Sequence, residues 1–170
     1  AVTVMIQTDA SPWGLGAIIV SGQQILAYIS DPLHEQDYQS FNSVPGNPSF
    51  QTEYELLAIY VALKEFAPWT HERGAQRVVL RNDNTSALRT AFSYKASSPI
   101  MTQLAAEIFL EMESQNVIHL IPQHLPGALN FVPDQLSRPQ TAKLPAVLHN
   151  VPKVNVPARS RAYYRAWPER

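Results

Sequence analysis

The chain has 170 residues, 45% of them hydrophobic and 16% charged, which favours one folded domain with a substantial core over a disordered segment. It contains no cysteine, so disulfide bonds and thiolate metal sites are excluded. No apolar run approaches the roughly 20 residues of a membrane-spanning helix, and the N-terminus lacks the basic region and cleavage site of a secretory signal. We therefore expect an intracellular protein, cytoplasmic or nuclear, without a membrane partner. The chain begins at Ala1 rather than Met, which fits both a fragment and a processed product.

The net charge of −1 is unevenly distributed along the chain. Residues 1–138 carry 7 basic and 13 acidic residues, whereas residues 139–170 carry six basic residues and one acidic residue. This second stretch also contains five prolines, which predict an extended, weakly structured segment. Its bases alternate with aromatic residues, a composition that can stack on nucleobases and pair with phosphates; a linker is the alternative. The residues concerned are Arg159, Arg161, Tyr163, Tyr164, Arg165 and Trp167. We therefore expect a domain at 1–138 and a Pro-rich basic and aromatic tail or linker at 139–170.

Three short apolar runs at the start of the chain predict β-strands. Residues 2–8 are rich in Val, Ile and Thr, residues 15–20 form a second run, and residues 23–30 form a third. The turns between them are short, at 11–14 and at 21–22, and each contains glycine. Strands joined this tightly form an antiparallel meander.

A break in the pattern and a helix follow the predicted meander. Residues 31–50 hold three prolines and a glycine among Asp, Asn and Ser, which predicts a long loop. Thr52 with Glu55 three residues later is the pattern of a capping box and predicts the start of a helix there. The apolar residues Leu56, Ile59, Tyr60 and Leu63 share one helical face. Pro68 predicts the end of this helix.

The remaining elements alternate between strands and helices. Residues 77–82 predict a strand and residues 84–92 a short helix. Ser98 is a predicted N-cap, with Pro99 in the first turn of a longer helix. Residues 116–121 predict the last strand and residues 124–130 a loop. A short helix then begins at Asn130 or Pro133 and ends before Pro139.

This order predicts an α/β fold built on a mixed five-stranded sheet. The meander supplies three antiparallel strands, and the two strands reached through helices add two parallel ones, with helices on both faces. Ligands of such sheets gather at the carboxyl ends of the parallel strands. Four acids have positions that converge on this edge: Asp9, Glu55, Asp83 and Asp134. Clustered carboxylates bind hard divalent cations, so metal-assisted phosphodiester chemistry is our first hypothesis.

Each of the four acids also has an ordinary structural explanation. Asp9 fits a turn at the end of a strand, and Glu55 fits the acidic position of the capping box. Asp83 fits a helix N-cap, and Asp134 fits a first helical turn, where the helix dipole favours an acid. Glu53 is a rival to Glu55, but residues two apart on a helix point about 200° apart, so only one of them can face the site.

Four segments resemble the sequence motifs of the ribonuclease H family. The first two are Thr8-Asp9-Ala10-Ser11 with Gly14 and Gly16, and the helical run from Glu55 to Leu63. The third is the segment from Val79 to Leu88, and the last runs from His124-Leu125-Pro126-Gly127 to Asp134-Gln135-Leu136-Ser137-Arg138. The residues of the last motif most resemble those of RNase H domains in retroelement reverse transcriptases, of the LTR or DIRS-like retrotransposon kind, or in a domesticated derivative.

The resemblance implies a metal-dependent endonuclease that cleaves the RNA strand of RNA–DNA hybrids. The family's acids correspond to Asp9, Glu55, Asp83 and Asp134, which would hold two Mg²⁺ ions that Mn²⁺ can replace. The family's flexible-loop histidine corresponds to His124, which would assist proton transfer or product release. Ser11, Asn84 and Asn130 correspond to residues that contact the hybrid. A reverse transcriptase polymerase domain in the same polypeptide is the implied partner.

Alternatives to this function remain open at the level of sequence. A non-catalytic module that binds nucleic acid or protein, and a DNA-cutting transposase or nuclease, are both possible on the same fold. His124 fits an ordinary loop histidine, and Ser11, Asn84 and Asn130 fit turns and caps equally well. The chain also departs from a minimal family member through its long segment 31–50. Residues 91–98 carry only Lys95 in place of a basic protrusion, which implies weak hybrid binding without a partner domain or the tail.

Overall fold

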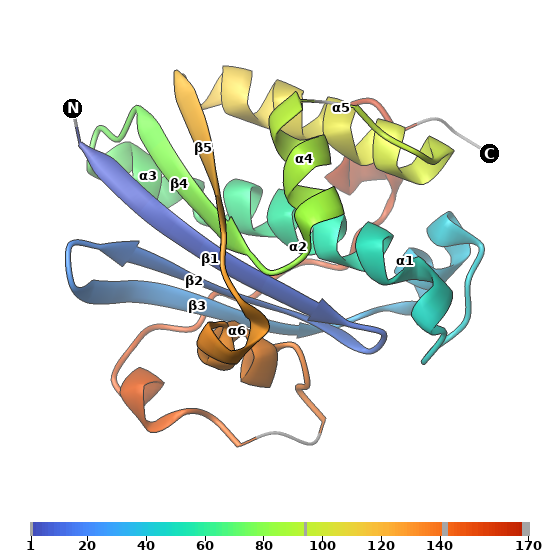
Figure 1. Ribbon diagram of the computed structural model, residues 1–170, viewed down its shortest axis with the longest axis horizontal. Helices are drawn as coiled ribbons and strands as arrows, with labels where there is room; N and C mark the ends of the chain where they lie inside the picture. The colour runs from blue at the N-terminus through green and yellow to red at the C-terminus, as the bar shows by residue number, and fades with distance from the viewer. Residues whose placement is uncertain (1, 94, 141–142, 168–170) are drawn as a thin grey trace.

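A five-stranded mixed sheet forms the centre of the protein. The structure, a computed structural model, describes residues 2–93, 95–140 and 143–167, so the last residues of the predicted tail, 168–170, lie outside the described residues (Figure 1). The strands are β1 (Thr3–Ser11), β2 (Gly14–Ser21), β3 (Gln24–Pro32), β4 (Arg77–Asn82) and β5 (His119–His124). Their order is β3-β2-β1-β4-β5, with β1, β2 and β3 antiparallel and β1, β4 and β5 parallel. The predicted fold class is confirmed.

Helices cover both faces of the sheet. The helices α1 (Glu35–Phe41), α2 (Gln51–Glu65), α3 (Ala67–Glu72), α4 (Thr85–Ser93) and α5 (Pro99–Ser114) lie on one face, and α6 (Phe131–Leu136) lies on the other (Figure 1). Most of α2 is buried, because α5 packs on the side that faces away from the sheet. Among the described residues, every helix is too short or too polar to cross a membrane.

Two predicted helix boundaries are confirmed and one is wrong. The Ser98 hydroxyl accepts a hydrogen bond from the Met101 N–H at 3.2 Å and caps α5 as predicted. The capping box at Thr52 does not form: α2 already begins at Gln51, and the Glu55 carboxylate instead accepts a hydrogen bond from the Ala10 N–H. The predicted end of α2 before Pro68 is confirmed, since α2 ends at Glu65. Pro68 itself lies in the first turn of α3, where its missing N–H has no helical partner to lose.

Two further segments differ from the sequence prediction. Residues 31–50 are not a continuous loop, because α1 lies within them. The Asp37 carboxylate accepts a hydrogen bond from the His34 N–H at 2.9 Å and so stabilises the start of α1. The usual capping-box pattern has Ser or Thr at the N-cap, so it does not predict a helix that begins after a histidine. The last strand begins at His119 rather than Asn116, because Asn116 takes a left-handed φ of 55° just after α5.

The close approach of α6 to the sheet requires glycine in β2. A Cβ atom on Gly16 would lie 2.3 Å from the Pro133 carbonyl oxygen and 2.7 Å from the Ser137 nitrogen. Any larger residue would therefore push α6 away from β1 and β2. The apolar contacts on this face join Leu136 of α6 to β2 and β3 and to Leu148 of the C-terminal segment.

The C-terminal segment packs against the domain, which contradicts the expected weak structure of this stretch. Residues 152–154 run beside β3, with the Tyr28 N–H donating to the Pro152 carbonyl and the Val154 N–H donating to the Tyr28 carbonyl. The buried Arg159 guanidinium pairs with Asp31 and Asp37. The sequence suggests that the aromatic residues Tyr163, Tyr164 and Trp167 can stack on nucleobases. In the structure they are buried in the larger core and are therefore not free to do so.

We expect Arg159→Met to destabilise the protein strongly. The substitution keeps the length of the side chain but leaves the buried Asp37 carboxylate without its cation, which costs about 3–5 kcal/mol in comparable buried pairs. Urea denaturation followed by circular dichroism measures the free energy of unfolding. Arg161→Met is the matched control, because Arg161 is an exposed residue of the same segment. Equal stability of the two variants would contradict the anchoring role of Arg159.

Candidate active site

Three carboxylates meet at the carboxyl ends of the two central parallel strands. Asp9 lies near the end of β1, Asp83 follows β4 directly, and Glu55 lies in the second turn of α2. Each offers an oxygen atom, and these atoms all lie within 4.8 Å of one another. Asp9 and Glu55 are buried, whereas Asp83 is partly exposed, so the cluster is reached from solvent through Asp83. Oxygen ligands at this spacing fit hard divalent cations.

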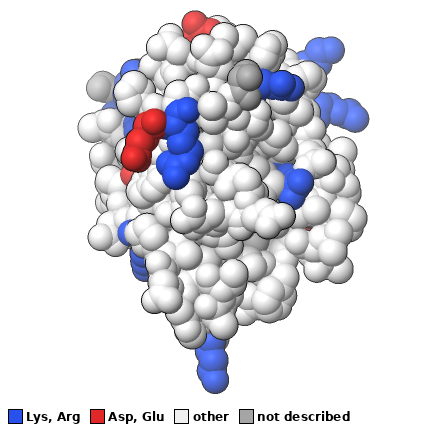
Figure 2. Space-filling model, turned by 90° about the vertical axis from the view of Figure 1, so that its left-hand side faces the viewer, with Lys and Arg blue, Asp and Glu red and all other residues white. Residues whose placement is uncertain are grey.

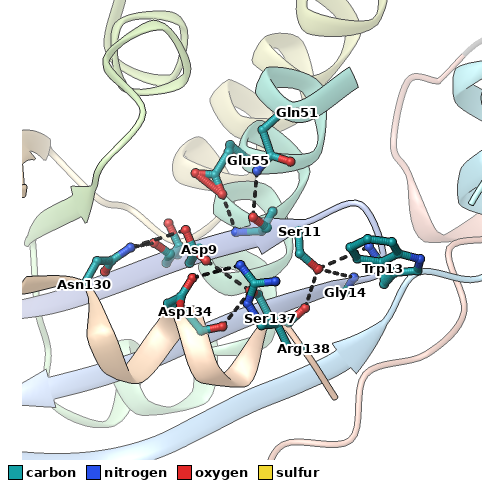
Figure 3. Close-up of polar contacts among 12 residues, drawn as sticks. Asp9, Ser11, Trp13, Gly14, Gln51, Glu55, Asn130, Asp134, Ser137 and Arg138 are labelled. Atoms are coloured by element: carbon teal, nitrogen blue, oxygen red, sulfur yellow. Dashed lines mark hydrogen bonds and ion pairs between the residues drawn. The ribbon is translucent and has the colours of Figure 1, made fainter. Parts of the chain in front are cut away.

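Asp134 lies beside this cluster but is not part of the group within 4.8 Å. Its side chain is 41% exposed and forms an ion pair with Arg138 at 3.4 Å, one turn along the chain. The Asp134 charge raises the pKa of Asp9, and the Arg138 charge lowers it, so both side chains lie near enough to act on the buried acid. Figure 3 shows Asp134 and Arg138 on the α6 side of Asp9, opposite Glu55.

The Asp9 side chain is held in place by α6 and by the loop before it. Alternation along β1 directs Gln7 and Asp9 toward the α6 face. The Ser137 hydroxyl donates to Asp9 Oδ2 at 3.0 Å, and the Asn130 amide donates to Asp9 Oδ1 at 3.5 Å (Figure 3). The Asn130 amide also donates to the Thr8 carbonyl at 3.0 Å, and the Gln7 amide donates to Asn130 Oδ1 at 2.9 Å. Asp9 therefore has little rotational freedom.

The Glu55 side chain is selected over Glu53 by the geometry of α2. Glu55 is 1% exposed and accepts a hydrogen bond from the Ala10 N–H at the end of β1. One turn earlier, the Gln51 amide donates to the Ala10 carbonyl at 2.7 Å, so β1 and α2 are joined on both sides of Ala10 (Figure 3). The Glu53 carboxylate points elsewhere and accepts from the Ser98 hydroxyl at 3.4 Å.

The crowded carboxylates hold their protons more tightly than free acids do. Burial, followed by the charge of Asp83, raises the pKa of Asp9 from 3.8 to about 7, although the hydrogen bond from Ser137 opposes the shift. Burial, followed by the charges of Asp9 and Asp83, raises the pKa of Glu55 well above its usual range. A divalent cation would remove this repulsion, because it stabilises the ionised form of each carboxylate.

His124 lies at the end of β5, next to the carboxylate cluster. Its Nε2 lies 3.1 Å from the Asp83 carbonyl oxygen, and because a carbonyl only accepts, Nε2 is the donor of this hydrogen bond. The loop after His124 returns over the site, since a Cβ on Gly127 would lie 3.4 Å from Asp83 Oδ2. The structure therefore places the exposed His124 beside Asp83, and its role in proton transfer or product release stays a prediction.

The three residues predicted to contact nucleic acid all have partners within the protein. The Ser11 hydroxyl donates to the Ser137 carbonyl at 2.6 Å, and Asn84 Oδ1 accepts from the Ala87 N–H at 2.9 Å and caps α4. Asn130 is fully buried and holds Asp9. Their contact with a hybrid stays a prediction, and the structure assigns them a role in positioning the site.

Sequence reasoning missed two polar residues that shape the site. Ser137 binds Asp9, and the Asn82 amide donates to the Thr8 carbonyl at 3.2 Å and to the Thr8 hydroxyl at 2.9 Å, which links β4 to β1 directly before the acids. Both residues lie inside the motifs that carry the resemblance. Their place inside these motifs is the sequence signal that they belong to the site, but it does not reveal which partner each side chain binds.

Comparison with solved structures identifies the fold as RNase H-like. LC11-RNase H1, isolated from compost by a metagenomic approach, matches with a TM-score of 0.63 at 19% identity, over 80% of this chain and 93% of that chain. An N-terminal RNase H domain from Mycobacterium tuberculosis, solved as a fusion with maltose-binding protein, matches with a TM-score of 0.60 at 17% identity, over 79% and 95%. LC11-RNase H1 in complex with an RNA/DNA hybrid matches with a TM-score of 0.57 at 21% identity, over 78% and 92%. No protein-family model and no curated protein matches the sequence.

We expect Asp9→Asn to stabilise the metal-free protein increasingly as the pH rises. The pKa of Asp9 is raised on folding from 3.8 to about 7, so the folded state binds more protons than the unfolded state between these values. The contribution of Asp9 to the free energy of unfolding therefore falls as the pH rises through this window. Urea denaturation in EDTA at pH 5 and pH 8 measures the difference between the variant and the wild type. If the difference in the free energy of unfolding between variant and wild type did not grow with pH, the raised pKa of Asp9 would be contradicted.

Proposed function

We propose that this protein is a metal-dependent endonuclease that cleaves the RNA strand of RNA–DNA hybrids. The observation that carries the proposal is the cluster of Asp9, Glu55 and Asp83 at the carboxyl ends of the central strands of an RNase H-like sheet. The motif resemblance supports the same reaction. The complex of LC11-RNase H1 with an RNA/DNA hybrid shows that this fold can bind such a substrate in another protein.

The carboxylate cluster has the chemistry that Mg²⁺ requires. Its oxygen atoms are hard ligands, and the raised pKa values of Asp9 and Glu55 reflect burial first and the charge of the neighbouring carboxylates second. We propose that Asp9, Glu55, Asp83 and Asp134 hold two Mg²⁺ ions, with Mn²⁺ as a substitute. When bound, such ions activate water and stabilise the leaving oxygen of a phosphodiester.

The surrounding residues prepare the site for hydrolysis. Ser137 and Asn130 fix both oxygens of Asp9, and the Ala10 N–H fixes Glu55, so the ligands need little rearrangement before the reaction. His124 donates through Nε2 to the Asp83 carbonyl and lies at an exposed position. We propose that His124 moves protons to or from the reacting groups, since a histidine near neutral pH serves as acid or base.

The polypeptide context is a separate part of the proposal. The wording of the last motif supports an origin in the reverse transcriptase of an LTR or DIRS-like retrotransposon, or in a domesticated derivative. Figure 2 shows one end of the molecule, where the Lys and Arg side chains lie apart from one another rather than in a patch. Residues 1–138 also carry only 7 basic residues against 13 acidic ones, and a domain with few basic groups binds phosphate backbones weakly. A polymerase domain in the same polypeptide, acting inside the cell, would supply the missing affinity.

We expect Glu55→Gln to abolish hybrid cleavage and Glu53→Gln to leave it near the wild-type rate. Both changes remove one negative charge from the first half of α2, but only Glu55 reaches the carboxylate cluster. The assay follows a labelled RNA strand in an RNA–DNA hybrid with Mg²⁺ or Mn²⁺, and circular dichroism checks folding. Asp83→Asn should remove activity in the same way. Duplex DNA and double-stranded RNA are the comparison substrates, and cleavage of DNA alone would favour a DNA-cutting nuclease.

We expect His124→Ala to slow turnover by about 100-fold without weakening Mg²⁺ binding, because general acid–base groups contribute on this scale and His124 is not a ligand in the proposed site. Single-turnover cleavage measures the rate, and isothermal titration calorimetry measures the metal affinity. His119→Ala is the matched control, since His119 lies exposed at the other end of β5. Loss of metal binding in His124→Ala would make His124 a ligand and its proposed role wrong.

A further inference from the structure

A hollow of about 220 Å³ lies between α6, β3 and the C-terminal segment. Two lysines line it, Lys143 and Lys153, and both side chains are exposed. The rest of its wall consists of the polar residues Tyr28, Ser30 and Gln135 and the apolar residues Leu136, Pro139 and Leu144. The lining contains no carboxylate, and neither lysine forms an ion pair within the part of the chain that the structure describes. Two unpaired ammonium groups at one hollow form a site for an anion.

Packing of the C-terminal segment places both lysines. Lys153 pairs with Tyr28 in a parallel bridge to β3, so the two side chains lie on the same face of the sheet, the face that α6 covers. Lys143 precedes the short helical turn Ala146–Leu148, which is anchored because Leu148 is fully buried against this face. The two cations therefore converge through tertiary packing, although ten residues separate them in the sequence.

The residues that line the hollow favour a phosphate group as the ligand rather than a carboxylate. The lysines supply charge without fixed geometry, as is usual in phosphate binding. The Gln135 amide adds neutral hydrogen-bonding capacity, whereas the Ser30 hydroxyl already donates to the Leu136 carbonyl at 2.7 Å. The exposed position of both lysines suits a ligand that passes over the surface, such as a nucleic-acid backbone.

The hollow shares α6 with the candidate active site. Gln135, in its wall, directly follows Asp134 in α6. A second hollow of about 450 Å³ shares Lys143 and Gln135 with it and contains the ring of Phe131, which is 60% exposed. An exposed aromatic ring beside cations is a combination that nucleic-acid-binding surfaces use to contact bases and sugars. A bare phosphate ion would make no use of the ring.

We propose that Lys143 and Lys153 bind a backbone phosphate of the RNA–DNA hybrid on the α6 side of the cleavage site. This inference rests on the proposed function, because it takes the hybrid as the ligand. This proposal replaces the expectation that the Arg and aromatic residues at the end of the tail contact nucleic acid. Arg159, Tyr163 and Trp167 are buried, and the segment acts on the hybrid through its first half instead.

The test is hybrid binding by the double variant Lys143→Gln/Lys153→Gln. Fluorescence anisotropy with a labelled hybrid is measured in Ca²⁺ over a range of salt concentrations. We expect about tenfold weaker binding and a salt dependence whose slope falls by about 1 to 2, because one or two phosphate contacts are lost. The matched control is Arg73→Gln/Arg77→Gln, which removes the same charge near α3 and the start of β4. Equal loss in both variants, or no loss in either, would overturn the proposal.

Two further measurements separate this inference from the proposed function. Cleavage of saturating hybrid should proceed at the wild-type kcat in the double variant, with a raised KM, since the lysines touch no reacting atom. Failure of the wild type to cleave, with lysine-dependent binding intact, would refute the proposed function and leave this inference standing.

In the second measurement, inorganic phosphate is titrated while the amide NMR signals of Gln135 and Lys153 are followed. Lysine-dependent shifts in a protein that binds no hybrid would assign the hollow to free phosphate and refute the inference.

Discussion

Repulsion among three carboxylates within 4.8 Å of one another is the constraint on which the rest of this structure depends. Two of the three are buried, and burial together with the neighbouring negative charge raises the pKa values of Asp9 and Glu55, so their ionised forms are disfavoured. The fold maintains it through β1, which contacts α2 at Ala10 and α6 at Asp9. Such stored repulsion is typical of functional sites, because a bound cation relieves it and gains affinity from the relief.

The position of α6 decides whether this arrangement can form. Gly16 allows the Pro133 carbonyl to approach β2, and this approach brings Ser137 and Asn130 within hydrogen-bonding distance of Asp9. The C-terminal segment supports the same face, because Leu148 packs with Leu136 of α6. It then passes the edge of β3, where the bridge at Tyr28 covers an otherwise open strand. The segment is thus linked to the site by packing, although it contributes none of the clustered acids.

Local sequence rules predicted the strands of the meander and the cap of α5 because neighbouring residues determine them. They failed where a side chain takes a distant partner. The pattern of Thr52 and Glu55 predicts a capping box, yet Glu55 binds Ala10, 45 residues earlier in the chain. Arg159 was read as a tail residue for phosphate, yet it pairs with Asp37, 122 residues away. No local pattern contains such a contact, since its energy depends on burial that only the folded chain creates.

The sequence by itself determined the order of the five strands, the mixed sheet and the position of Asp9 and Asp83 at strand ends, because strand patterns and turns are local properties. Tertiary structure decided the rest. It separated Asp134 from the three clustered acids, selected Glu55 over Glu53, and turned Ser11 and Asn130 toward partners inside the protein. It also brought Lys143 and Lys153 to one hollow. These outcomes depend on which surfaces pack together, and packing joins residues without regard to their distance along the chain.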